Sequence, residues 1–81
     1  MKIFVANFDS HTTEDDLYGL FSRYGSVKNV GVWVDVVHGE NRGFGFVEMP
    51  NHDHAKRAIR KLNGQWWHRR LLRVSKAHRT V

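Results

Sequence analysis

A β-strand with two different faces is predicted by the alternation in Arg42-Gly43-Phe44-Gly45-Phe46-Val47-Glu48-Met49. One face carries Arg42, Phe44, Phe46 and Glu48, and the other carries Gly43, Gly45, Val47 and Met49. The face with Val47 and Met49 is expected to meet the core, where Gly45 would let a helix approach closely. The two phenylalanines then stand on an uncovered face. Because neighbouring exposed Phe side chains are costly to leave in water, they indicate a binding surface.

The segments on either side predict two helices and three further strands. The expected elements are strand 2–8, a helix from the N-cap Thr13 to a stop at Gly25, strand 26–37, a turn at His38-Gly39, strand 42–49, a helix from a cap at Asn51 or Asp53 to Asn63-Gly64, and a last strand of about 71–77. Each helix is apolar along one stripe. Both helices should therefore cover the same face of the sheet and leave the other face open.

The octamer at 42–49 resembles the RNP1 motif of the RNA recognition motif (RRM) family at every position except Met49, which replaces an aromatic residue. Residues 3–8 resemble the RNP2 motif, with Phe4 at its aromatic position. The whole chain looks like the stand-alone RRM proteins of bacteria. The resemblance implies an α+β, ferredoxin-like βαββαβ sandwich with a four-stranded antiparallel sheet in the order 4-1-3-2 and two helices on one face. It also implies a single domain over residues 1–78 and a short basic tail at 79–81.

In this family the two motif strands lie side by side, which would bring Phe4, Phe44 and Phe46 together. By family position, Phe4 and Phe46 are expected to stack on bases of single-stranded RNA, and Phe44 is expected to pack against a sugar or between two sugars. Arg42 would then meet a phosphate. Each stack is worth about 1–3 kcal/mol, so a few stacks with phosphate contacts predict roughly micromolar affinity. The expected role is in post-transcriptional RNA metabolism or RNA chaperoning. Single-stranded DNA stays open as a partner because stacking does not read the 2′-hydroxyl.

Other residues are expected around these aromatics. If the valines of the second strand face the core, Trp33 lies on the open side, where it would stack on another base or cover the edge of the Phe cluster. Contacts at the rim with base edges or phosphates are expected from Lys2, Arg73, Ser75, Lys76 and His78. For each rim residue the alternative is a solvated polar side chain.

Trp66-Trp67, just before the last predicted strand, does not belong to the predicted binding face. Trp67 is expected to cover the end of the core. Trp66 is a candidate for weak self-association or a protein partner, with packing on a helix edge as the alternative. The competing function is an RRM-like module for protein–protein interaction or self-association, whose surface binds a peptide or another copy of itself. Such a module is expected to lack the motif aromatics, and all three are present here.

The charge of the 81-residue chain is +5 and unevenly spread, with a net −3 on residues 1–40 and +8 on residues 41–81. A basic half suggests a polyanionic partner. Part of this charge lies on the second predicted helix, behind the sheet, where a solubilising face is the favoured interpretation and weak RNA contact the alternative. The four cations of that helix are Lys56, Arg57, Arg60 and Lys61.

The sequence lacks the residues that disulfides, metal sites and common catalytic or cofactor sites require. Cysteine is absent, which excludes disulfides and thiolate zinc sites. Only His52 and His54 are close in sequence, and their spacing on a helix points them apart, so no metal is expected. No catalytic triad, Walker lysine or dinucleotide loop is visible, so we expect no enzyme activity, no cofactor and no small-molecule substrate. The apolar runs are short and broken, so we expect no membrane association and a cytoplasmic protein.

Overall fold

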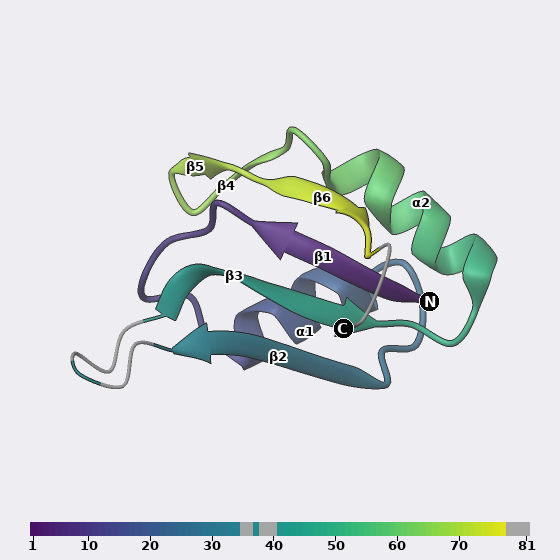
Figure 1. Ribbon diagram of the computed structural model, residues 1–81. Helices are drawn as coiled ribbons and strands as arrows, with labels where there is room; N and C mark the ends of the chain where they lie inside the picture. Colours follow the sequence, from purple (N-terminus) through teal and green to yellow (C-terminus); the bar gives the residue numbers. More distant parts are fainter. Residues whose placement is uncertain (35–36, 38–40, 78–81) are drawn as a thin grey trace.

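The computed structural model describes residues 1–34, 37 and 41–77, with only the backbone of Asn41 and Arg42. Its elements in chain order are β1 (Lys2–Ala6), α1 (Glu14–Ser22), β2 (Asn29–Val34), β3 (Asn41–Glu48), α2 (His52–Leu62), β4 (Trp66–Trp67), β5 (Arg70–Leu71) and β6 (Arg73–Lys76). Figure 1 shows the strands of the main sheet in front, with α1 and α2 behind them. The two predicted helices are confirmed, and both lie on one side of the sheet.

The main sheet has four antiparallel strands in the order β2-β3-β1-β6. β1 is central, and its Phe4 lies opposite Phe46 on β3 and Ser75 on β6. Opposite residues of an antiparallel pair point to the same face, so this register brings the two motif aromatics together. The predicted ferredoxin-like α+β fold, with its fourth, first, third and second strands side by side, is confirmed.

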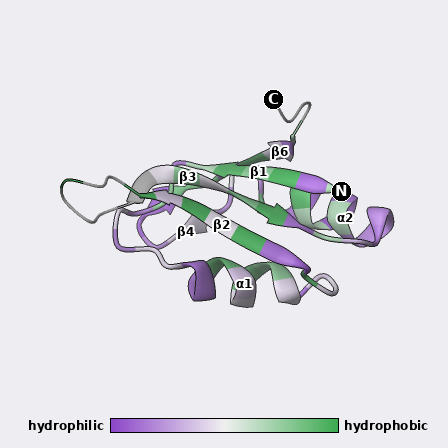
Figure 2. Cartoon of the chain, turned by 60° about the horizontal axis from the view of Figure 1, so that its bottom comes forward, coloured by the Kyte–Doolittle hydropathy of each residue, from purple (hydrophilic) through white to green (hydrophobic). Residues whose placement is uncertain are grey.

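The sheet face that meets the helices is apolar. Ile3 and Val5 on β1, Val47 on β3 and Val74 on β6 are almost completely buried. The helices add Leu17, Leu20, Phe21, Ala55, Ala58 and Leu62 to the same core. In Figure 2 the apolar colouring runs along β1, β2 and β3, and α1 and α2 carry hydrophilic turns. Burying one large apolar side chain is worth about 1.5–3 kcal/mol, so this core, more than helix propensity, stabilises the short helices.

Both helices begin at side-chain caps. The Thr13 hydroxyl accepts a hydrogen bond from the Asp16 N–H at 3.1 Å, and the Asp16 carboxylate accepts one from the Thr13 N–H at 2.9 Å. This is the capping box that the sequence predicts. At α2 the side chain of Asn51 accepts from the His54 N–H at 3.0 Å, so Asn51, and not Asp53, is the cap.

The predicted last strand, about residues 71–77, is wrong at its beginning, because the strand is interrupted at Leu72. The Leu72 N–H donates to the Gln65 carbonyl at 2.9 Å, and the Gly64 N–H donates to the Leu72 carbonyl at 2.8 Å. The chain therefore first pairs with the residues just before it, as a two-stranded β4–β5 sheet in which Trp66 lies opposite Leu71. Only Arg73–Lys76 join β1 as a strand of the main sheet.

The predicted role of Gly45 needs correction as well. A Cβ atom at Gly45 would collide with the carbonyl oxygen of Gly31 and crowd the Cα of Val32, both on β2. The missing side chain thus makes room for the neighbouring strand and not for a helix. The register between β2 and β3 shifts between Val32 and Val34, which marks an irregularity in this pair. The predicted turn at His38-Gly39 lies outside the described residues.

Candidate functional site

Four aromatic side chains gather on the open face of the sheet. This aromatic platform consists of Phe4 on β1, Trp33 on β2, and Phe44 and Phe46 on β3. The Phe44 ring centroid lies 6.4 Å from that of Phe4 and 5.2 Å from that of Trp33, and the Trp33 and Phe46 centroids are 6.1 Å apart. Phe4 and Trp33 are 39% and 47% exposed despite their apolar surfaces. Such a surface offers ring faces to planar ligands.

Gly31, on β2, also shapes this platform. It lies opposite Phe46 in the register of β2 and β3. A Cβ atom at Gly31 would collide with the Cε1 atom of the Phe46 ring. The missing side chain therefore lets the ring extend over β2 toward Trp33. Only the strand register reveals this role, because nothing in the local pattern of residues 29–34 indicates a neighbouring ring.

Gly43, the first glycine of the octamer, has a conformational role. Its φ of 82° lies in the left-handed region that glycine adopts most readily. Its carbonyl accepts a hydrogen bond from the Asn7 N–H at 2.7 Å, just beyond the end of β1. This bend ties the start of β3 to the end of β1 and so helps to place Phe44 on the platform.

Polar side chains surround the aromatic platform. The Lys2 Nζ lies 4.8 Å from the centroid of the Phe46 ring, within the range of a cation–π contact. Arg73 and Ser75 are exposed and share the open face, because they lie opposite Ala6 and Phe4 of β1. These positions at the rim agree with the sequence analysis. Contact of these side chains with RNA stays a prediction.

Lys76 does not lie on the open face, contrary to the sequence analysis. It is opposite Ile3, whose side chain is fully buried between the sheet and the helices. Neighbouring residues of a strand point to opposite faces, so Ser75 and Lys76 cannot both face the platform. Lys76 is therefore on the helix side of the edge strand β6. The side chain of Arg42 and all of His78 lie outside the described part of the chain, so their contacts with RNA stay predictions.

Glu48 introduces a negative charge on the open face. Its carboxylate accepts a hydrogen bond from the Asn29 side chain at 2.9 Å, across β2 and β3. This hydrogen bond lowers the pKa of Glu48 below its ordinary value, and the charges of Lys28 and Lys2 act in the same direction. The sequence places Glu48 on this face but does not predict its partner. Because the carboxylate stays charged at neutral pH, it disfavours a phosphate at this end of the sheet.

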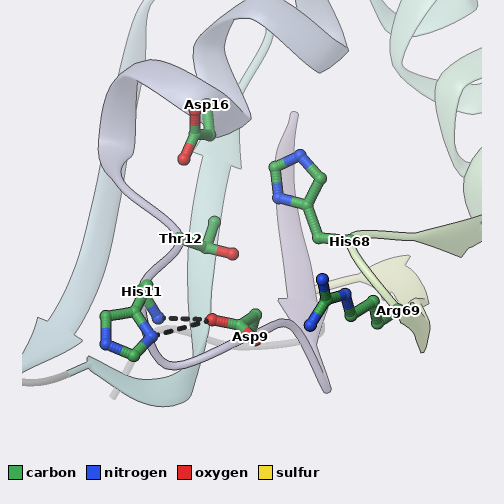
Figure 3. Close-up of a pocket in the computed structure, with 6 residues that line it drawn as sticks. All are labelled: Asp9, His11, Thr12, Asp16, His68 and Arg69. Carbon is green, nitrogen blue, oxygen red and sulfur yellow. Dashed lines mark hydrogen bonds and ion pairs between the residues drawn. The ribbon is translucent and has the colours of Figure 1, made fainter.

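A separate pocket of about 480 Å³ lies between the β1–α1 connection and the β4–β5 turn (Figure 3). Its lining residues are Asp9, His11, Thr12, Asp16, His68 and Arg69. The His11 N–H donates to the Asp9 carboxylate at 2.7 Å, and this hydrogen bond lowers the pKa of Asp9. The pocket combines the Arg69 guanidinium with the carboxylates of Asp9 and Asp16, and it contains none of the platform aromatics.

The described residues hold no cluster of three or more His, Asp or Glu side chains suited to a metal ion. The His54 ring packs against Gly25, where an added Cβ atom would collide with it. Within the same part of the chain, no helix has the length and apolar character needed to cross a membrane.

Trp66 and Trp67 differ in their surroundings. Trp67 is partly buried against the core, as predicted, and its ring stacks on the His68 ring with centroids 3.9 Å apart. Trp66 is 64% exposed, and its cross-strand neighbour Leu71 is 52% exposed. The exposed Trp66 thus belongs to the β4–β5 hairpin and not to the aromatic platform.

The match to a family model covers residues 3–73, and the model describes the RNA recognition motif. The chain belongs to the RNA recognition motif family. This RRM is 46% identical over 77 residues to RbpE of Nostoc sp., a protein named as a candidate RNA-binding protein, and the match covers 95% of this chain and 78% of RbpE. The resemblance found in the sequence to the RRM proteins of bacteria is confirmed.

Solved structures agree with this assignment. The crystal structure of RNA Binding Protein PG1 matches this RRM with a TM-score of 0.93 and 41% identity, over 100% of this chain and 98% of that one. A Sxl-lethal protein/RNA complex matches with a TM-score of 0.92 and 28% identity, over 99% of this chain and 48% of that one. The first comparison covers essentially the whole of both chains, so the RRM fold accounts for the described structure.

Proposed function

We propose that this RRM binds single-stranded RNA on the aromatic platform. The observation that carries the proposal is the continuous contact of Phe4, Phe44, Trp33 and Phe46 on the sheet face opposite α1 and α2 (Figure 1). The bases of single-stranded RNA are splayed and stack on aromatic rings. Relatives named for RNA binding and a similar chain in a protein/RNA complex support the same function.

Each part of the platform has a proposed role. Phe4 and Phe46 stack on bases, Phe44 packs against a sugar, and Trp33 adds a further base at the β2 edge. The proposed polar contacts with phosphates or base edges come from Lys2, Arg42, Arg73, Ser75 and His78. At about 1–3 kcal/mol for each stacked base, this surface gives roughly micromolar affinity without any catalytic step.

The proposed setting is RNA metabolism or RNA chaperoning in the cytoplasm, with residues 1–78 as the binding domain and 79–81 as a basic tail. Single-stranded DNA is the alternative nucleic acid, since the stacking surface alone does not distinguish the sugars. A DNA strand of the same sequence, titrated beside the RNA, measures this preference directly.

The function is tested by titrating labelled single-stranded RNA decamers of random sequence and following fluorescence anisotropy. Replacing Phe44 and Phe46 together by Ala removes two ring contacts, so the Kd should rise by at least about 30-fold at 1 kcal/mol or more for each ring. Tyr18→Ala is the matched control, because Tyr18 is an aromatic residue 52% exposed on α1. If the double variant and the wild type bind RNA with equal affinity, the aromatic platform is not the binding site.

Self-association is a second candidate function, favoured by one observation. Trp66 and Leu71 are both more than half exposed and lie opposite each other on the β4–β5 hairpin. Sedimentation of the wild type beside Trp66→Ser measures it: a dimer that dissociates in the variant supports self-association. A monomer at all concentrations leaves RNA binding as the only function proposed for the described surface.

A further inference from the structure

The helix layer carries a dense basic surface behind the aromatic platform. Four exposed cations occupy positions i, i+1, i+4 and i+5 of α2, which fall on one side of a helix. Lys76 is exposed on the helix side of β6, the edge strand that packs beside α2. We define this basic face as Lys56, Arg57, Arg60, Lys61 and Lys76.

The fold itself does not account for these charges. Within the described residues, no carboxylate oxygen lies within 4.0 Å of a side-chain nitrogen of the basic face. Even Asp53, which is exposed on the same helix, forms no such ion pair with these described side chains. The helix dipole stabilises the positive charges of Arg60 and Lys61, which lie in the last turn of α2. Lys56 and Arg57 lie too far from that end to gain this stabilisation. A cluster of like charges without partners raises the free energy of the free protein, and a polyanion would relieve it.

We propose that the basic face binds the phosphate backbone of a second nucleic-acid segment, independently of base sequence. Charge complementarity identifies this occupant, because five of the 13 Lys and Arg residues of the chain lie together on the basic face. On the open face, Lys2 is partly balanced by Glu48, which lies opposite it. The protein would then hold two RNA segments at once, one on each face, which is the arrangement that strand annealing requires.

Two features limit the choice of partner. The apolar side of α2 is buried in the core and no large apolar side chain of the helix is exposed, so α2 cannot insert into a membrane surface as an amphipathic helix does. The first turn of α1 carries three acidic residues, Glu14, Asp15 and Asp16. These carboxylates repel phosphate and confine the proposed footprint to α2 and β6.

The test uses a blunt RNA duplex of about 16 base pairs, whose paired bases cannot stack on the aromatic platform. Wild-type protein should bind it at 50 mM salt and lose about 100-fold in affinity at 200 mM, as expected for about four neutralised phosphates. Arg57→Gln with Arg60→Gln keeps residues of good helix propensity and should weaken duplex binding at least tenfold. One molar equivalent of a single-stranded hexamer, which the aromatic platform would take up, should not displace the duplex, whereas it would compete if both bound the platform.

Arg23→Gln with Lys28→Gln is the matched control, because it removes the same charge from other parts of the chain and should change duplex affinity less than twofold. The platform variant with Phe44→Ala and Phe46→Ala should bind duplex as the wild type does, so failure of this proposal is distinguishable from failure of the proposed single-strand site. Equal duplex binding by the α2 variant and the control overturns the proposal. It is equally overturned if the wild type ignores duplex but binds anionic vesicles or pairs α2 with the acidic turn of a second copy.

Discussion

At the scale of single residues, the binding surface depends on where side chains are missing as much as on where rings are present. Phe46 can extend over β2 only because Gly31 has no Cβ atom, and β2 can approach β3 only because Gly45 has none. The collision at Gly45 is with backbone, which cannot move without breaking the strand pairing. The collision at Gly31 is with the far end of a ring, which can move. The two glycines therefore separate a requirement for folding from a requirement for binding.

The first prediction concerns Gly31→Ala. The new methyl group should displace the Phe46 ring while the fold is retained, so the Kd for single-stranded RNA should rise by about 5- to 150-fold, the equivalent of one lost stack. Anisotropy titration measures the affinity, and thermal unfolding confirms the fold. Gly19→Ala on α1 is the control, since its Cβ atom would meet nothing within 4 Å. The control should keep its RNA affinity and gain up to about 1 kcal/mol in stability. Unchanged RNA affinity of Gly31→Ala would contradict the role given to the ring.

At the scale of elements, the β4–β5 hairpin is attached to the end of β1 by side chains. The Arg70 guanidinium donates to the Asn7 carbonyl at 3.2 Å and to its side-chain oxygen at 2.8 Å. The Asn7 side chain in turn donates to the Leu71 carbonyl at 2.8 Å. Asn7 has a φ of 66°, a conformation that Asn tolerates better than most residues. These contacts explain how a two-stranded hairpin, unstable alone, stays ordered beside the main sheet.

Arg70→Lys tests this attachment, because lysine cannot reproduce the two-pronged contact with Asn7. Losing a hydrogen bond worth about 1 kcal/mol should accelerate amide hydrogen exchange of Leu72, which bonds Gln65 across the hairpin, by about fivefold. Amides in β1 and β3 should exchange at the wild-type rate. Arg57→Lys, on the exposed side of α2, is the control and should leave the Leu72 amide unchanged. If Leu72 stays equally protected in Arg70→Lys, other contacts hold the hairpin.

The elements also show why sequence reasoning succeeded at some positions and not at others. The capping box of Thr13 and Asp16 and the outward alternation of Phe44 and Phe46 are local patterns, and the structure contains them as predicted. The strand break at Leu72 and the clearance at Gly45 depend on partners far away in space. Local alternation cannot reveal such pairings, because they are set by strand register and hydrogen bonding across the sheet.

At the scale of the whole molecule, the two faces of the sheet have different chemistry. The open face combines aromatic rings with few charges of both signs, whereas α2, on the helix side, carries a cluster of four cations. Carboxylates with lowered pKa lie at opposite ends of the molecule: Glu48 near the start of β2, and Asp9 after β1. A group whose pKa is lower in the folded state stabilises the fold above its unfolded pKa and loses that effect as pH falls through the folded pKa.

The pH dependence of stability follows from this sign. Glu48 and Asp9 should contribute a constant stabilisation from pH 7 down to about pH 5, and lose it below their ordinary values of 4.5 and 3.8. Thermal unfolding of the wild type and of Glu48→Gln between pH 7 and 2.5 measures the Glu48 part. The wild-type Tm should fall more steeply than that of the variant below pH 4.5. Parallel curves over the whole range would show that the Asn29 contact does not favour the charged carboxylate.

RNA binding on the aromatic platform is tested by NMR, by following the indole N–H signals of the three tryptophans as a six-nucleotide single-stranded RNA is added. At 200 mM salt, where contacts with phosphate alone are weak, the Trp33 signal should shift together with the backbone amides of Phe4, Phe44 and Phe46. The signals of Trp66 and Trp67, on the hairpin, should stay in place. Shifts confined to Trp66 or to α2, with an unchanged Trp33 signal, would contradict RNA binding on the aromatic platform.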